Sequence, residues 1–234
     1  MVRLGASAAR HARARPARAW PARARPARLP LAASLTGGSG TRRARSSPSS
    51  APRPPWVSAL AASLPPRFAD APSRYWEGGA LGAGGSQVHG PDTVLALLHD
   101  AGAFADPALL VDAARREVLL TLRTGARVAG HPGWTHGGFT GLLLDEMAGQ
   151  AYCEFVQPAR GPGVTANLNV DYATPLPTAM DLLVAARIAS VEDRKVRVRV
   201  VVADGPDVND AERTVFAEAT ALFVVLDKAS GDGR

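Results

Sequence analysis

The run of residues 137–155 constrains the fold of this chain more than any other feature of the sequence. It is predicted to be a helix, because apolar residues recur along it at helical spacing. They cover most of the helix circumference, which is typical of a helix buried nearly all round. These residues are Phe139, Leu142, Leu143, Leu144, Met147, Ala148 and Ala151. Other parts of the chain must therefore surround this helix.

The period of the apolar residues changes to two after the helix. Four stretches then alternate as β-strands do, on short connections; they are residues 164–172, 182–189, 195–203 and 214–226. Before the helix, apolar stretches occur at 109–111 and 118–122, and the second of these is predicted to be a strand. A short amphipathic helix is expected over 94–101, with Asp92 as its N-cap. This order predicts an α+β domain whose antiparallel sheet curls round one long helix, with final strands long enough to pair with a second copy.

Two carboxylates, Asp145 and Glu146, interrupt the apolar helix. A charged carboxylate in such surroundings is costly unless it is paired, lies at an interface or lines a cavity. The two side chains project about 100° apart round the helix, so they cannot point the same way. We expect one to face a site and the other to face solvent or an ion-pair partner. The alternative is that both are solvated at a loosely packed edge.

Gly137 and Gly138 stand where this helix begins. They could simply form the turn into the helix, or they could leave free N–H groups that stabilise an oxyanion. Asp145 follows Gly137 by eight residues, which is about 12 Å along a helix axis. A catalytic carboxylate and an oxyanion donor must both lie roughly 3 Å from one reacting group. Two antiparallel helices in a two-fold dimer would meet this requirement, with Gly137 of one protomer opposite Asp145 of the other.

Three further candidate sites have ordinary structural alternatives. Thr165 could position a water or hold a carboxylate, or it could be only a β-forming residue of its strand. His136 precedes the two glycines and is more often a histidine that supports a loop than a catalytic base. Arg194 and Lys195 lie at a predicted turn, where they could bind a phosphorylated ligand or be solvated.

The amino-terminal third differs sharply in charge from the rest of the chain. Residues 1–69 contain thirteen arginines and no Asp, Glu or Lys, whereas the remaining residues contain 14 basic and 21 acidic residues, a net charge of −7. Because the positive charge lies on a tail, we expect no nucleic-acid partner. Residues 1–55 are expected to be disordered, because prolines are dense and large apolar residues few. Their composition is that of an organelle transit peptide, with a mitochondrion expected ahead of a plastid; the alternative is a solvated basic tail on a cytoplasmic protein.

Turn residues indicate the remaining domain boundaries, and the cysteine count and apolar runs exclude some kinds of structure. Residues 56–90 are assigned to a linker, 91–228 to the folded domain and 229–234 to a carboxyl-terminal tail. Cys153 is the only cysteine, which excludes a disulfide within the chain and a cysteine-based zinc site. No run approaches 18 apolar residues, so no transmembrane segment is expected.

The motifs resemble those of the hotdog-fold thioesterase superfamily, and within it the mitochondrial, membrane-associated acyl-coenzyme A thioesterases. The resemblance covers about residues 91–228. It rests on His136-Gly137-Gly138, on Asp145 nine positions after the histidine, on Thr-Ala-Asn-Leu-Asn-Val-Asp-Tyr at 165–172 followed by Pro175, on Glu-Asp-Arg-Lys at 192–195 and on Glu-Ala-Thr-Ala-Leu-Phe at 218–223. It implies a helix held in an antiparallel sheet, a homodimer or a dimer of dimers, and hydrolysis of acyl-coenzyme A without a metal or cofactor.

The resemblance also implies roles for individual residues. Gly137 would provide the oxyanion N–H, Asp145 would act as general base or nucleophile, Thr165 would orient the water and His136 would support the loop. Gly138, Arg194 and Lys195 fall where the family contacts coenzyme A. Alternatives from the same fold are a hydratase and a non-catalytic acyl-coenzyme A-binding protein.

Two departures from the family pattern accompany the resemblance. About four extra residues separate Asp145 from Thr165, which places an insertion around 157–163. Gly130 stands where some relatives have an asparagine. The role of Asp145 is little affected by either departure, whereas the preferred acyl chain is left open.

Overall fold

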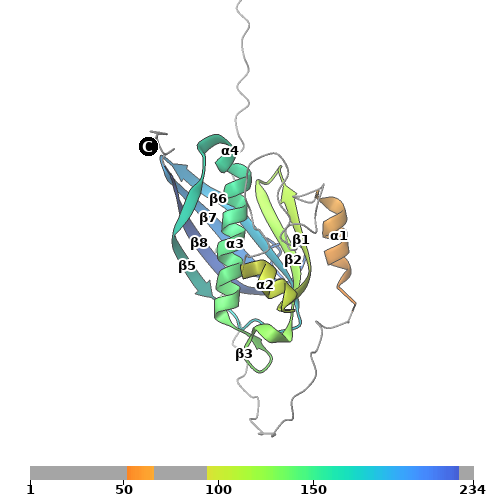
Figure 1. Cartoon of the computed structure of the whole chain (residues 1–234). Coiled ribbons are helices and arrows are strands. Elements are labelled where there is room, and N and C mark those ends of the chain that lie inside the picture. Colours follow the sequence, from red (N-terminus) through yellow and green to blue (C-terminus); the bar gives the residue numbers. More distant parts are fainter. Residues whose placement is uncertain (1–51, 66–93, 227–234) are drawn as a thin grey trace, which may run out of the picture.

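The computed structural model describes residues 52–65 and 94–226, in which one long helix lies along a six-stranded antiparallel sheet (Figure 1). The strands follow one another across the sheet in the order β1-β2-β6-β7-β8-β5. They are β1 (Phe104–Asp112), β2 (Glu117–Thr124), β5 (Gly163–Tyr172), β6 (Asp181–Glu192), β7 (Lys195–Ala203) and β8 (Val215–Val225). All strands predicted from the sequence are confirmed, and β7 has the predicted ends. The α+β architecture expected from the sequence is therefore correct.

The long helix, α3 (Gly137–Phe155), has the bounds that the sequence predicts. It contacts strands β2, β5, β6, β7 and β8. Its predicted apolar residues are buried against the inward-facing side chains of the sheet, except Leu142, which is partly buried. One side of the helix is less buried than the rest. We call this side the open stripe; it is formed by Gly138, Leu142, Asp145 and Gly149. The helix is thus buried nearly all round, with a carboxylate on the side that is not.

Shorter elements connect the large ones. They are α2 (Val94–Asp100), a 3-10 turn (Ala126–Val128), the hairpin β3 (Ala129–His131) and β4 (Trp134–Thr135), and α4 (Gln157–Arg160). α2 agrees with the helix predicted over 94–101, whereas its predicted N-cap, Asp92, lies outside the described residues. α4 falls in the segment 157–163, where the motif spacing indicates an insertion. None of the described helices is both long and apolar enough to span a bilayer.

A further helix, α1 (Pro55–Ser63), covers the outer face of the sheet, which is the face turned away from α3. Trp56, Leu60 and Leu64 pack there on a second apolar cluster. The buried members of that cluster are Leu110, Leu119, Leu183, Ala185, Val201, Ala203 and Val208. Beyond the helix, the carbonyl oxygen of Pro65 accepts a hydrogen bond from the N–H of Val111 on the edge strand β1, at 3.1 Å. The part of the chain assigned to a linker therefore begins with an element of the fold.

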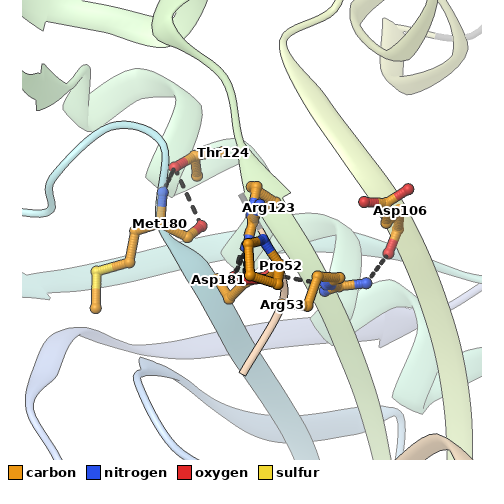
Figure 2. A network of polar contacts seen from close by, with 7 residues as sticks. All are labelled: Pro52, Arg53, Asp106, Arg123, Thr124, Met180 and Asp181. Carbon is orange, nitrogen blue, oxygen red and sulfur yellow. Dashed lines mark hydrogen bonds and ion pairs between the residues drawn. The ribbon is translucent and has the colours of Figure 1, made fainter. Parts of the chain in front are cut away.

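An ion-pair network fixes the start of α1 to the sheet (Figure 2). Arg53 donates from Nε to Asp181 Oδ1 at 2.8 Å and from Nη1 to the carbonyl oxygen of Asp106, also at 2.8 Å. Asp181 accepts a second guanidinium, that of Arg123, on its other oxygen, and both of these side chains are almost fully buried. Arg123 also donates to the carbonyl oxygen of Pro52 at 3.3 Å. Residues 52–55, predicted at the end of a disordered segment, are thus held by the fold; residues 1–51 lie outside the described part.

Candidate active site

The N–H groups at the amino terminus of α3 differ in their hydrogen-bond partners. Gly138 N–H donates to Nδ1 of His136, the N-cap residue, at 2.8 Å. The N–H groups of Phe139 and Thr140 both approach the carbonyl oxygen of His136, at 3.0 and 3.2 Å. The N–H of Gly137 has no hydrogen-bond partner among the described residues. This N–H belongs to the same peptide unit as the His136 carbonyl. The hydrogen bonds that the carbonyl accepts from Phe139 and Thr140 therefore polarise the N–H of Gly137 and make it a better donor.

The imidazole of His136 is held between two glycines. A Cβ at Gly130 would lie 3.0 Å from His136 Cδ2, and one at Gly138 would lie 2.9 Å from His136 Nδ1. The second distance is shorter than real Cβ contacts and the first is tighter than most, so a side chain at either position would require the ring to shift. His136 also donates its own N–H to the carbonyl oxygen of Val128 at 2.7 Å. In this structure His136 therefore supports the turn, and Gly130 is tied to the packing of its ring.

The carboxylate of Asp145 lies on the open stripe and meets strand β5. Its Oδ1 accepts a hydrogen bond from Oγ1 of Thr165 at 3.0 Å. Glu146 points elsewhere, because its Oε1 accepts from Nε2 of the buried Gln150, one turn later in the helix, at 2.7 Å. The two adjacent carboxylates thus have different environments, as their helical positions require.

Thr165 reaches Asp145 because β5 is irregular. Leu168 and Val170 of β5 pack against the helix-side core, and strict alternation would turn Thr165 to the opposite face. The pairing with β8 shifts, however, between Thr165, which pairs with Phe223, and Asn167, which pairs with Leu222. Such a bulge adds one residue and redirects the side chains beyond it. Thr165 consequently faces the helix together with its buried partner Phe223.

The remaining predicted site residues are not all brought together. Gly137 lies eight residues from Asp145 on the same helix, about 12 Å along its axis. Arg194 and Lys195 lie at the turn between β6 and β7, where Arg194 Nε donates to the carbonyl oxygen of Val225 at 3.1 Å. Lys195 pairs with Val224, which pairs in turn with Val164. This places Lys195 two strands, or roughly 10 Å, from β5. Within one chain, the amino terminus of α3, the carboxylate of Asp145 and the basic turn at Arg194 and Lys195 are three separate locations.

A cavity of about 220 Å³ opens beside the amino terminus of α3. Gly137 and Tyr172 form part of its wall, and Leu176 and Phe216 contribute apolar surface. Tyr172, from the end of β5, donates its hydroxyl to the carbonyl oxygen of Gly137 at 2.9 Å. A ligand group in this cavity would therefore lie beside Gly137. Within residues 52–65 and 94–226, no group of three His, Cys, Asp or Glu side chains is arranged to hold a metal ion.

Comparison with known proteins agrees with this geometry. Residues 132–211 match the thioesterase superfamily model, and this range includes α3, its amino-terminal turn and the strand that carries Thr165. This part of the chain is therefore similar to the thioesterase superfamily. The resemblance drawn from the sequence motifs is thereby confirmed at the level of the superfamily.

Individual members of the thioesterase superfamily and other relatives match parts of the chain. Acyl-coenzyme A thioesterase THEM4 of Rattus norvegicus is 32% identical over 120 residues, which are 51% of this chain and 48% of the rat protein. MIOREX complex component 3 of Saccharomyces cerevisiae is 29% identical over 90 residues, 38% of this chain and 33% of the yeast protein. The matched part thus spans about half, or less, of each curated relative. The crystal structure of zebrafish thioesterase superfamily member 2 is 19% identical, covering 58% of this chain and 90% of its own, with a TM-score of 0.46.

Two features of this candidate site could not be predicted from the sequence. The bulge at Ala166 has no marker there, since alanine is neither a glycine nor a proline that would signal an irregular strand. The contact of Tyr172 with Gly137 joins residues 35 positions apart. A strand tyrosine is ordinarily explained by its β-propensity alone, which gives no hint of a partner.

Proposed function

We propose that the protein is an acyl-coenzyme A thioesterase that forms one active site from two protomers. The observation that carries the proposal is the unpaired N–H of Gly137 on the helix that also presents the Thr165-bound carboxylate of Asp145. The two groups suit hydrolysis of a thioester, but they lie too far apart to act on one carbonyl. The open stripe contains Gly138 and Gly149, which would let a second copy of α3 approach closely, and β5 is an edge strand that a second β5 can pair with.

In the proposed reaction, Asp145 acts as general base. Thr165 holds Oδ1, so Oδ2 is the oxygen that accepts a proton from the attacking water. The water oxygen bonds to the thioester carbon, and the partner subunit's Gly137 donates its N–H to the oxyanion. Collapse of this intermediate breaks the carbon–sulfur bond, and the thiolate of coenzyme A takes the proton back from Asp145. The same carboxylate could instead attack the carbon directly, in which case water would hydrolyse the resulting anhydride.

The acyl group would enter the cavity beside Gly137, and the basic turn would meet the phosphates of coenzyme A. Leu176 and Phe216 give the cavity apolar surface. Arg194 and Lys195 are exposed at the turn between β6 and β7, where guanidinium and ammonium groups can bind phosphate. The proposal needs no metal and no cofactor, since coenzyme A is part of the substrate.

The test measures thiol release from a panel of acyl-coenzyme A esters that differ in chain length. Asp145→Asn should lower kcat by about a thousandfold or more, because the variant cannot accept the proton. Glu146→Gln is the matched control, because it makes the same chemical change one residue away and should leave kcat within a factor of about two. Loss of enoyl absorbance is followed in parallel. Enoyl hydration without thiol release, or tight binding without turnover, would replace the proposal with a hydratase or an acyl-coenzyme A-binding protein.

We further propose that residues 1–51 address the protein to an organelle, with a mitochondrion ahead of a plastid. Eleven of the thirteen arginines of the acid-free segment lie in these residues, and this composition supports the assignment. Fusion of residues 1–51 to a fluorescent protein should give mitochondrial fluorescence. Diffuse cytoplasmic fluorescence would show that the segment is only a basic tail.

A further inference from the structure

The two glycines at the proposed oxyanion donor have no side chains of their own to restrain them. Gly137 and Gly138 are adjacent, and glycine gives a backbone more freedom than any other residue. An oxyanion donor is effective only when it is held in place before the reaction. The contacts that restrain these two glycines therefore decide how well the donor can work.

Each residue of the turn takes part in a hydrogen bond that restrains it. His136 donates its N–H to Val128 at 2.7 Å, and Gly138 donates its N–H to the imidazole of His136 at 2.8 Å. Gly137 itself is reached by the hydroxyl of Tyr172, which donates to its carbonyl oxygen at 2.9 Å. The first two contacts come from the turn and the segment just before it. The third contact comes from the sheet, through Tyr172 at the end of strand β5.

The ring of Tyr172 adds to the restraint. A Cβ at Gly137 would lie 3.6 Å from two ring carbons of Tyr172, which is ordinary van der Waals distance. The ring therefore lies over Gly137, although 58% of the residue is exposed. An exposed tyrosine can give its hydroxyl to water at little cost, so packing alone does not require this hydroxyl to point at a backbone carbonyl. A phenylalanine would pack in the same way and leave the carbonyl without this donor.

We propose that Tyr172 is a positioning residue for the oxyanion donor, an inference that rests on the proposed thioesterase function. Its hydroxyl fixes the carbonyl of Gly137 and hence the orientation of this residue, so that the N–H of Gly137 points at the substrate carbonyl. Tyr172 does not touch the reacting atoms. The oriented N–H stabilises the transition state more than the bound substrate, because it bonds most strongly to the negative charge that develops in the transition state.

The chain offers a matched control for the hydroxyl of Tyr172. Tyr152, near the other end of α3, donates its hydroxyl to the carbonyl oxygen of Gly161 at 2.8 Å. Tyr172→Phe and Tyr152→Phe therefore each remove one tyrosine-to-glycine hydrogen bond and keep the ring. Tyr152 is buried and stacks on Phe223 with ring centroids 5.0 Å apart, so its variant reports on the stability of the fold.

The experiment compares the full-length wild type with the two variants. Tyr172→Phe should lower kcat by about three- to tenfold with KM unchanged. Tyr152→Phe should lower the melting temperature and leave kcat as it is. Equal kcat in Tyr172→Phe and wild type would overturn the proposal, and so would an equal loss of kcat in both variants, which would mean that any weakening of the fold has this effect.

A second measurement does not depend on activity. Hydrogen exchange of the amides of residues 137–140 should be about three- to tenfold faster in Tyr172→Phe than in wild type or Tyr152→Phe. If wild type hydrolyses no acyl-coenzyme A ester, the proposed function fails and this measurement alone decides the positioning role. Unchanged exchange would then reject the role, and faster exchange would uphold it for whatever ligand the turn binds.

Discussion

The hydroxyl of Thr165 donates to Oδ1 of Asp145 at 3.0 Å, across the space between strand β5 and the open stripe of α3. The contact assigns the two carboxylate oxygens different roles, since one is occupied by a protein donor. Thr165→Val should therefore lower kcat by about tenfold, because the carboxylate loses the bond that orients it. Valine keeps the shape and β-propensity of threonine, so the fold should be unaffected. Thr165→Ser restores a hydroxyl and should recover most of the rate; equal activity of the valine and serine variants would contradict the assignment.

The role of the Gly137 N–H can be tested without disturbing its surroundings. Gly137→Pro removes the N–H at the first helical position, where proline is well tolerated. The preceding His136 has φ −65° and ψ 131°, the extended conformation that a residue before proline prefers. We expect kcat to fall by about 100- to 1000-fold at an unchanged melting temperature.

Gly137→Ala is the control for this proline variant, since it adds a similar Cβ but keeps the N–H. That Cβ would lie 3.6 Å from Tyr172, an ordinary contact. Its kcat should stay within a few-fold of wild type. If alanine and proline reduce kcat equally, the defect is steric and the N–H is not the oxyanion donor.

The proposed dimer has a predictable register. Along strand β5, Tyr172 lies beside Gly137 of the helix, and Thr165 lies beside Asp145. For the partner's Gly137 to face Asp145, the two-fold axis must pass midway between Thr165 and Tyr172, near Leu168 and Asn169. In a Cys153→Ser background, Asn169→Cys should cross-link to its own copy by oxidation or with a short bis-maleimide, because its Cα would lie close to the axis.

Asp171→Cys serves as the control for the cross-link. It lies on the same strand, but roughly 16 Å would separate the two copies at 3.3 Å per residue, too far for a disulfide. Cross-linking is read as a band of doubled mass on a denaturing gel. Efficient cross-linking at 171 and none at 169 would exclude this register, and with it the shared site.

A buried carboxyl on the outer face predicts a pH dependence of stability. Burial raises the pKa of Glu117 above its ordinary value of about 4.5, although Arg115 and Arg187 oppose the rise. A carboxyl whose pKa is raised in the folded state contributes stability below its unfolded pKa and loses that contribution as pH rises through the folded pKa. The free energy of unfolding of wild type minus that of Glu117→Gln should therefore be constant below about pH 4 and should decrease from there upward. Urea denaturation at a series of pH values gives this difference, and a constant value up to pH 8 would contradict the raised pKa.

The shared carboxylate of Asp181 should be a major contributor to stability. Asp181→Asn removes the carboxylate that pairs with the buried guanidinium of Arg123, and breaking a buried ion pair typically costs about 3–5 kcal/mol. Asp106→Asn is a suitable control, because Arg53 binds the backbone carbonyl of Asp106 and not its side chain. Urea denaturation should show a large loss of stability for the first variant and almost none for the second. Equal stability of both variants would mean that the ion pair contributes little.

Periodicity predicts most of this fold, because its main elements are long and strongly patterned. α3 has the predicted ends, and in β7 the valines that alternate with Arg197 and Arg199 are buried, as the pattern indicates. The helix α1 was not predicted, since the prolines around it indicate a linker and its apolar residues are few. Its partners lie on strands more than forty positions away in the sequence.

The candidate site could be predicted only in part, for a similar reason. Gly137 and Asp145 stand out from the sequence because both belong to one helix, whose geometry fixes their separation. Thr165 has a side-chain direction that depends on the bulge at Ala166, a property of the pairing between β5 and β8. Tyr172 contacts the amino-terminal turn of the helix from strand β5, 35 positions later in the sequence. Contacts of this kind depend on tertiary structure, which local sequence patterns do not encode.

The ion pair between Arg53 and Asp181 determines how much of the amino terminus can be removed without loss of a described contact. A protease that trims the amino terminus can cut anywhere before Pro52 without disturbing a described contact. A cut after Leu64 would strip α1 from the outer face, expose the apolar cluster beneath it and leave Asp181 with one guanidinium instead of two. The smallest stable form of the protein should therefore begin near residue 52, well before residue 132, the first residue of its match to the thioesterase superfamily model.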